Sequence, residues 1–344
     1  MFRTLFKRFW LFALLCFVVL YPAISDRYSV YIANLVMISI IASLGLNILT
    51  GYSGQISLGH GALVSIGAYT AAVLMHEYGW PVIAAVAAAG VFTGAVGFLL
   101  GIPALRLTGP YLAIATLAMM LALPQILKLN GIRDLTGGVS GVLLSTPHAP
   151  SAVEGFMTDR QWLYYACMAP ALLMTLLAWN ITRGRTGRAF IALRDSEIGA
   201  QQMGVNVSLY KMIAFALSAF YAGIGGGLFV FTEAFMSPDT FDVNLSITML
   251  VVVVLGGLTS NTGTAIAALI MTFRNDLVDS LSSLGILRLP GALLPGREQD
   301  AYTLRGALYG TLLIVTVMFM PRGIAGAMRD ARDRWQWPAL RQRR

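Results

Sequence analysis

The chain has 344 residues, of which 57% are hydrophobic and only 12% are charged. Soluble domains contain about 25% charged residues, so this composition excludes a water-soluble globular protein and places much of the chain in lipid. The net charge of +8 does not indicate a nucleic-acid-binding protein, because only three of the 24 basic residues are lysine and they form no stripe along one face. An excess of basic residues on cytoplasmic loops explains the charge better.

Ten apolar stretches are candidates for membrane-spanning helices, each of which needs about 20 residues to cross the hydrocarbon core. We therefore expect an all-α, polytopic transmembrane helix bundle of about ten spans, forming one domain over residues 1–344. The eighth and ninth stretches are short, and are either tilted spans or half-helices that meet at Gly256 and Gly257. The ten stretches are 9–25, 28–50, 58–75, 81–105, 109–127, 162–182, 212–232, 243–258, 262–273 and 306–320.

The first stretch also has features of a secretory signal, because Arg3, Lys7 and Arg8 precede its apolar run. Pro22 and Asp26 follow without a clear small-residue cleavage site, and a second apolar stretch begins almost at once. We expect an uncleaved first span, and a cleaved signal is the alternative.

The distribution of charge predicts that both termini lie in the cytoplasm. With the N-terminus inside and the spans alternating, the inside segments hold 16 basic and 4 acidic residues, and the outside segments hold 8 basic and 12 acidic residues. This asymmetry agrees with the positive-inside rule. The same topology makes 128–161 an external loop, 183–211 a cytoplasmic segment and 321–344 a basic cytoplasmic tail.

Two absences bear on the source of energy. None of the ten stretches contains Asp, Glu, Lys or Arg, whereas proton-driven transporters carry ionisable residues within the membrane. The phosphate-binding motif of ATPases needs a Gly-Lys pair. The three lysines follow Phe6, Leu127 and Tyr210, so the sequence contains no such motif. We expect no catalytic residue, metal or cofactor in this chain, and Cys16 and Cys167 to be small buried hydrophobes.

The densest polar motif lies at 51–61, between two apolar stretches. Its four glycines and its polar side chains are typical of an unwound segment in a broken membrane helix, where free backbone groups can bind a substrate. The alternative is a tight cytoplasmic turn followed by a glycine-rich helix contact, with the histidine serving only in packing. The predicted residues of a substrate pathway are Gly54, Gln55, Ser57, Gly59 and His60.

A second motif at 187–206 has the pattern of short amphipathic helices, with a helix stop at Gly204. Such helices lie on a membrane or dock in a groove of a partner protein, and the alternative is a solvated basic loop. The expected apolar face comprises Phe190, Ile191, Leu193, Ile198 and Met203, and the polar face comprises Arg188, Arg194, Asp195 and Glu197. A third motif at 256–263 is either a counterpart of the first motif or a close helix-packing turn.

These motifs resemble, in order and over nearly the whole length, the permeases of branched-chain amino acid ABC transporters, specifically the LivM-like branch. The resemblance implies a subunit of the bacterial inner membrane that pairs with a second related permease, two cytoplasmic ATPase subunits that hydrolyse ATP, and a periplasmic binding protein. The matching segments are 49–60, 66–69, 135–138, 187–206, 210–211, 237–238, 256–257 and 321–323.

The resemblance also implies roles for two segments. Residues 188–204 resemble the coupling segment that docks on the ATPase, with Ala200 and Gly204 at signature positions and Gly199 in place of the more usual alanine. Arg188, Arg194, Asp195 and Glu197 would carry the docking contacts. Residues 51–60 resemble the broken segment near the pathway.

The expected function is that of a permease subunit of an importer for branched-chain or other hydrophobic amino acids. Permeases for urea or short amides, and a passive channel for a small neutral solute, are the alternatives. A membrane-embedded enzyme using His60 with Ser53 or Ser57 would lack an intramembrane carboxylate to orient its imidazole.

Overall fold

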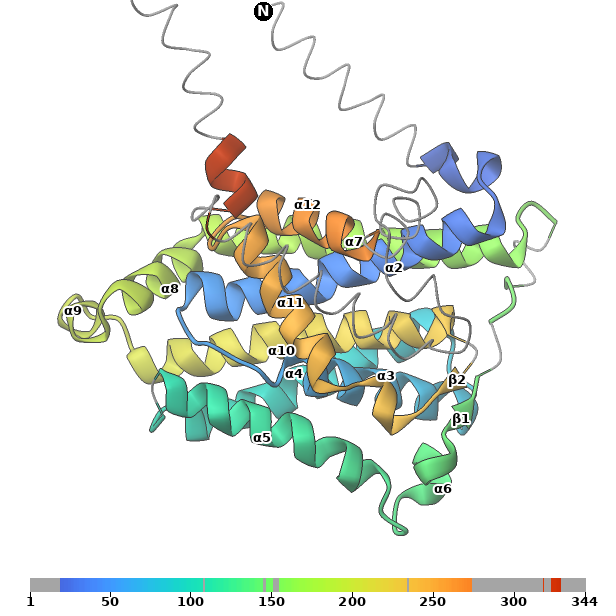
Figure 1. Cartoon of the computed structure of the whole chain (residues 1–344), viewed down its shortest axis with the longest axis horizontal. Helices are drawn as coiled ribbons and strands as arrows, with labels where there is room; N and C mark the ends of the chain where they lie inside the picture. Colours follow the sequence, from blue (N-terminus) through green and yellow to red (C-terminus); the bar gives the residue numbers. More distant parts are fainter. Residues whose placement is uncertain are drawn as a thin grey trace, which may run out of the picture.

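The computed structural model describes residues 19–273, 318 and 323–328, except 108, 145–146, 151–154 and 234. Within them, long helices lie side by side in one bundle (Figure 1). The elements are α2 (Arg27–Leu46), the π-helical turn η1 (Asn47–Tyr52), α3 (His60–His76), α4 (Val82–Ala104), α5 (Pro110–Leu127), α6 (Arg133–Thr136), η2 (Gly138–Ser140), β1 (Val142–Leu143), α7 (Asp159–Arg183), α8 (Arg185–Asp195), α9 (Glu197–Gln202), α10 (Val207–Thr232), β2 (Phe235–Met236), η3 (Pro238–Thr240), α11 (Val243–Gly256) and α12 (Asn261–Thr272).

Six helices of the described chain are long and apolar enough to cross a membrane. The expectation of an all-α membrane bundle is therefore confirmed, whereas the count of ten spans and the cytoplasmic side of the termini stay predictions. Most of stretches 9–25 and 306–320 lies outside the described residues. The six segments are Arg27–Tyr52, Val82–Ala104, Pro110–Leu127, Asp159–Arg183, Val207–Thr232 and Pro238–Gly256.

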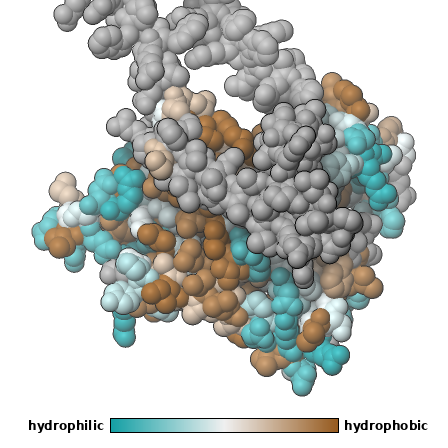
Figure 2. Space-filling model, viewed as in Figure 1, coloured by the Kyte–Doolittle hydropathy of each residue, from teal (hydrophilic) through white to brown (hydrophobic). Residues whose placement is uncertain are grey.

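The surface of the bundle is apolar in the middle and polar at both ends. Figure 2 shows hydrophobic residues across the centre of the described face, with hydrophilic residues gathered over α8 and α9 on the left and again on the right. This distribution suits a bundle whose ends reach water while its middle faces lipid. We call these ends the α8 end and the β1 end, after the elements found there (Figure 1).

The β1 end differs from the purely helical expectation, because it contains two short strands. Val142 pairs with Met236, and Leu143 with Phe235, in a two-residue antiparallel ladder between β1 and β2. Nearby, the Lys128 ammonium lies 2.7 Å from a carboxylate oxygen of Asp239. Segment 128–161 is thus tied to the connection between α10 and α11.

Close packing of α10 against α4 forms the centre of the bundle. Glycines on one face of α4 let the two backbones approach, as small residues do in membrane helix pairs. A Cβ on Gly97 would lie 2.8 Å from the carbonyl oxygen of Phe215 and against the Ala219 side chain, and a Cβ on Gly101 would lie 2.9 Å from Met212 Cα. On its other side, α10 contacts α3 at Gly223 and Gly226.

We expect Gly97→Ala to lower the free energy of unfolding by about 1–3 kcal/mol, because the added methyl group overpacks the contact between α4 and α10. Thermal unfolding of the purified chain in lipid nanodiscs measures this loss. Gly131→Ala is the matched control, because no described atom beyond its two chain neighbours lies within 4 Å of its added Cβ. Equal stability of the two variants would contradict the close packing.

Candidate functional site

The chain between α2 and α3 is a break in helical structure. The end of α2 widens into the π-helical turn η1, in which the Ser53 amide donates to the Ile48 carbonyl at 3.1 Å. Residues 53–59 then have no regular helix, and α3 begins at His60. The predicted unwound segment is thus present, and π-helical turns are frequent at functional sites. We call residues 53–59 the break.

Side chains along the break alternate between the inside and the outside of the bundle. Ser53, Gln55 and Ser57 are buried, whereas Gly54 and Ile56 are exposed. The Gln55 side-chain amide donates to the Ser53 hydroxyl at 2.8 Å, and the Ser53 hydroxyl donates to the Leu49 carbonyl at 2.9 Å. A row of hydroxyl and amide groups therefore lines the inner face of the break.

The Gln55 side chain is not fully satisfied. Its Oε1 is buried and has no hydrogen-bond partner among the described residues, although its backbone carbonyl accepts from Thr50 Oγ1 at 3.1 Å. A buried polar atom without a partner costs about 1–3 kcal/mol. Such an atom marks a place that a water or a polar ligand can occupy.

His60 joins three helices. Its Nε2 lies 2.8 Å from the carbonyl oxygen of Ala42 on α2, and its Nδ1 lies 3.4 Å from the hydroxyl of Ser218 on α10. Since a carbonyl only accepts, Nε2 carries the proton and Nδ1 accepts from the serine. In this conformation the imidazole contributes to packing and contacts neither Ser53 nor Ser57 by a hydrogen bond. Its place in a substrate pathway stays a prediction.

The far side of the break is held by α5 and α11. The Leu58 amide donates to Thr116 Oγ1 at 3.0 Å, and the Gly61 amide donates to Ser246 Oγ at 2.9 Å. Gly59 lies directly against the carbonyl group of Thr116, so that a side chain there would overlap α5. These contacts place Ser57 and Gly59 between α3 and α5.

The third motif is a tight turn between α11 and α12 that packs on η1. A Cβ on Gly256 would lie 2.5 Å from the Thr264 amide nitrogen, so the two helices approach closely. The Tyr52 hydroxyl donates to the Thr259 carbonyl at 2.7 Å. The Asn47 amide donates to Asn261 Oδ1 at 3.2 Å. The motif therefore forms a helix-packing turn, one of its two expected alternatives, and it also supports the break.

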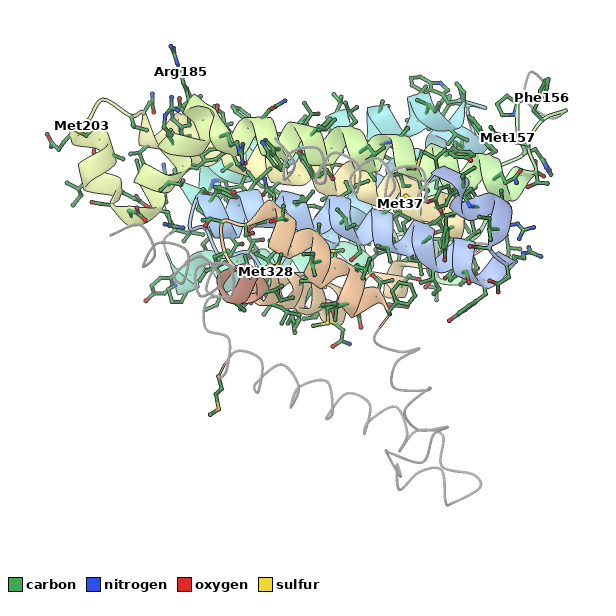
Figure 3. The ribbon with its side chains drawn as sticks, turned by 90° about the horizontal axis from the view of Figure 1, so that it is seen from above. Met37, Phe156, Met157, Arg185, Met203 and Met328 are labelled. Atoms are coloured by element: carbon green, nitrogen blue, oxygen red, sulfur yellow. The ribbon has the colours of Figure 1, made fainter. Side chains whose placement is uncertain are left out.

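The second motif forms two helices at the α8 end, as predicted. Its expected apolar face is divided, however. Phe190 and Leu193 are buried against the bundle, whereas Ile198 and Met203 on the α9 side are 75% and 85% exposed. Figure 3 shows Met203 at the tip of this end, pointing away from the bundle, with Arg185 also at the surface.

Arg194 connects this segment to the break. Its guanidinium pairs with Asp195 through Nη2 at 2.8 Å and donates from Nη1 to the Gly51 carbonyl at 3.3 Å. A Cβ on Gly54 would lie only 2.6 Å from Arg194 Cγ, and Gly54 has a positive φ of 75°. A residue other than glycine would be strained there. The predicted pathway and the predicted coupling segment are therefore in direct contact.

The remaining coupling residues divide between surface and interior. Arg188 is exposed, whereas Ala200 is buried. The Glu197 carboxylate lies 2.7 Å from the ammonium of Lys211, whose side chain is almost fully buried at the start of α10. Gly204, with a φ of 81°, ends α9 as predicted. None of these contacts tests docking on a partner, which stays a prediction.

Several residues of this site were not predicted from the sequence. Their only sequence signal is a polar side chain within or beside an apolar helix, which marks a packing or functional contact. Thr182, for example, accepts from the Asn261 amide at 3.0 Å. The described residues contain no group of three His, Cys, Asp or Glu side chains that could hold a metal. The residues that were missed are Asn47, Thr116, Thr182 and Ser246.

Comparison with known proteins assigns this architecture to a family. A family model described as branched-chain amino acid transport system / permease component matches residues 28–317. The high-affinity branched-chain amino acid transport system permease proteins LivM of Salmonella typhimurium (strain LT2) and Escherichia coli (strain K12) are each 35% identical to the chain over 312 residues, which cover 85% of this chain and 73% of theirs.

A more distant relative matches a smaller part. The autoinducer 2 import system permease protein LsrC of Enterobacter sp. (strain 638) is 31% identical over 145 residues, which cover 37% of this chain and 42% of that protein. No solved structure matches the chain. Together with the six apolar helices, the matches to the family model and to LivM show that this multi-pass membrane protein belongs to the branched-chain amino acid transport permease family, in its LivM-like branch.

Proposed function

We propose that the chain is the membrane-spanning permease subunit of an ATP-binding-cassette importer in the bacterial inner membrane, and that it carries branched-chain or other hydrophobic amino acids. It would act with a second related permease, two cytoplasmic ATPase subunits and a periplasmic binding protein. Membership of the permease family supports transport. The contact of Arg194 with the break is the observation that carries the mechanism.

The inner face of the break is the proposed substrate path. Ser53, Gln55 and Ser57 offer hydroxyl and amide groups in a row, and Gln55 Oε1 lacks a partner. Irregular backbone of this kind is tolerated within a membrane only where protein or a watery cavity surrounds it. These side chains are buried in this conformation, so a substrate reaches them only when the break moves.

The segment formed by α8 and α9 is the proposed lever for that movement. Arg188, Asp195 and the two exposed apolar side chains Ile198 and Met203 would form the surface that docks on an ATPase. Arg194 would transmit a displacement of this surface to Gly51 and Gly54, because its side chain contacts both. The Glu197–Lys211 ion pair would transmit it to α10.

The scarcity of buried charged residues in the described part of the chain supports an external source of energy. Lys211 is the one Lys, Arg, Asp or Glu residue that is buried among those described here, and it is paired. Proton-coupled transporters instead place carboxylates or histidines along a relay within the membrane. ATP hydrolysed by partner subunits is the proposed driving force.

Uptake by the assembled importer in proteoliposomes tests the proposed function. With binding protein and ATP, we expect leucine, isoleucine and valine to accumulate, and urea and acetamide to remain at background. Accumulation should stop when the ATPase subunits carry an inactivating substitution. Equilibration of a neutral solute without ATP would instead establish a passive channel.

The substitution Gln55→Ala tests the substrate path. Removing one hydrogen-bonding group that faces the substrate should reduce the initial rate of leucine uptake by about threefold to tenfold. Assembly of the complex should be unchanged, as measured by co-purification of the chain with the ATPase subunits. Ile56→Ala is the control, because Ile56 faces away from the row. Equal initial rates of leucine uptake for the two variants would show that the break is a structural turn and not a substrate path.

The substitution Arg194→Ala tests the lever. Loss of the contacts with Gly51 and Gly54 should lower the amount of leucine carried per ATP hydrolysed by about fivefold or more, a coupling free energy of about 1 kcal/mol, while basal ATP hydrolysis continues. Arg185→Ala is the control on the same helix, since Arg185 is exposed. An unchanged ratio of leucine to ATP in Arg194→Ala would show that the contact is not part of coupling.

A further inference from the structure

A cavity of about 470 Å³ lies at the β1 end, opposite to α8 and α9. It is formed by the first turns of α2 and α7 and by the last turn of α10. Figure 3 shows Phe156 and Met157, just before α7, at this end and far from Met203. Pockets for small molecules have volumes of about 300–1,000 Å³, so the cavity is large enough for a metabolite.

Two cationic side chains line the cavity. Arg27 is the first residue of α2 and Arg160 is the second residue of α7, and both are exposed. In the described chain, neither guanidinium forms an ion pair with a carboxylate. The positive ends of the two helix dipoles point to the same place. This part of the cavity suits a carboxylate.

A buried acceptor lies one to two turns deeper. Asn34 is only 1% exposed, and its Oδ1 has no hydrogen-bond partner in the described part of the chain. The Tyr31 hydroxyl, also in the cavity wall, donates to the Glu233 carboxylate at 2.7 Å. A buried amide oxygen without a partner suits an ammonium group.

The acidic side chain in the wall is already engaged. Asp159 accepts from the Ala149 amide at 2.8 Å and from His148 at 3.0 Å. Within the described chain, Asp159 forms no ion pair with Arg27 or Arg160. The pKa of the exposed Asp26 carboxyl is lowered, chiefly because the Ser29 hydroxyl donates a hydrogen bond to it. The positive charge of Arg160 lowers this pKa further.

Apolar side chains complete the wall. Val30 and Phe231 are buried, and Leu163 is half-buried. A ligand that matches all three regions has a carboxylate, an ammonium group and an apolar side chain. Inorganic phosphate or a lipid phosphate would satisfy the arginines alone and would leave Asn34 and the apolar wall without partners.

We propose that this cavity is an entry subsite of the permease that binds a free, zwitterionic amino acid with an apolar side chain, before the substrate reaches the break. The carboxylate lies on Arg27 and Arg160, the ammonium group on Asn34 Oδ1, and the side chain against Val30, Leu163 and Phe231. The proposal rests on the proposed function for the direction of transport and adds a binding site at the opposite end of the bundle from the break.

Equilibrium binding of radiolabelled leucine to the full chain in phosphatidylcholine nanodiscs, without binding protein or ATP, tests the subsite. We expect saturable binding that is weakened about tenfold or more by Arg160→Gln and by Asn34→Leu. Arg133→Gln, an exposed arginine of the same end outside the cavity, should bind as the unsubstituted chain does. Leucinol, which lacks the carboxylate, and 4-methylpentanoate, which lacks the ammonium group, should compete poorly.

Each contrary result is decisive. Equal leucine binding by Arg160→Gln, which lies at the surface and leaves the fold intact, overturns the subsite even if Asn34→Leu fails to fold. Displacement of leucine by millimolar phosphate or by phosphatidylglycerol in the nanodisc, as strong as by valine, shows a general anion site and also overturns it. ATP-driven leucine uptake by the unsubstituted complex is measured in parallel: its absence refutes the proposed function, whereas its presence with unaltered binding by the variants refutes the subsite alone.

Discussion

A membrane helix can be interrupted only if every backbone group freed by the interruption finds a new partner, because lipid offers none. The rest of the site depends on this constraint. The break after α2 frees several amide and carbonyl groups in the interior of the bundle. Their new partners come from Thr50 in η1, Thr116 on α5 and Ser246 on α11, and from Arg194 at the α8 end. The broken helix is therefore held by elements from most of the chain.

This constraint explains why three motifs that are far apart in the sequence meet at one end of the bundle. The turn between α11 and α12 contributes the Thr259 carbonyl to Tyr52. The α8 segment contributes Arg194, which reaches the Gly51 carbonyl. A displacement of either element changes the hydrogen bonds of the break directly. The surface segment and the interior of the bundle are thus joined by polar contacts of defined geometry.

The centre of the bundle has the opposite character. There, α10 packs on α4 and α3 through glycines that let the helix backbones approach closely. Close packing of this kind resists small displacements, because side chains already fill the available space. The bundle therefore combines a tightly packed middle with two polar ends, one at the break and one at the cavity lined by Arg27, Asn34 and Arg160. A substrate that enters at one end and leaves at the other would use both.

The amino-acid sequence was sufficient to predict the membrane environment, the positions of most helices and the interruption at 51–60. These are local properties: a long apolar stretch requires a helix in lipid, and clustered glycines with polar neighbours permit a break. It also predicted helices at 187–206 from their amphipathic pattern. Stretch 58–75 corresponds to α3, and stretch 262–273, although short, corresponds to α12.

The folded bundle is needed to identify the groups that hold the break and its flanks, because the partners are far apart along the chain. The separations are 58 residues for Leu58 and Thr116, 185 for Gly61 and Ser246, and 207 for Tyr52 and Thr259. It also divided the apolar residues of 187–206, burying Phe190 and exposing Ile198 and Met203, and it turned His60 toward Ala42 and Ser218. The same holds for Asn34, whose burial beside two arginines no local pattern indicates. The physical reason is that helix formation depends on neighbouring residues, whereas contacts between helices depend on how the whole bundle packs.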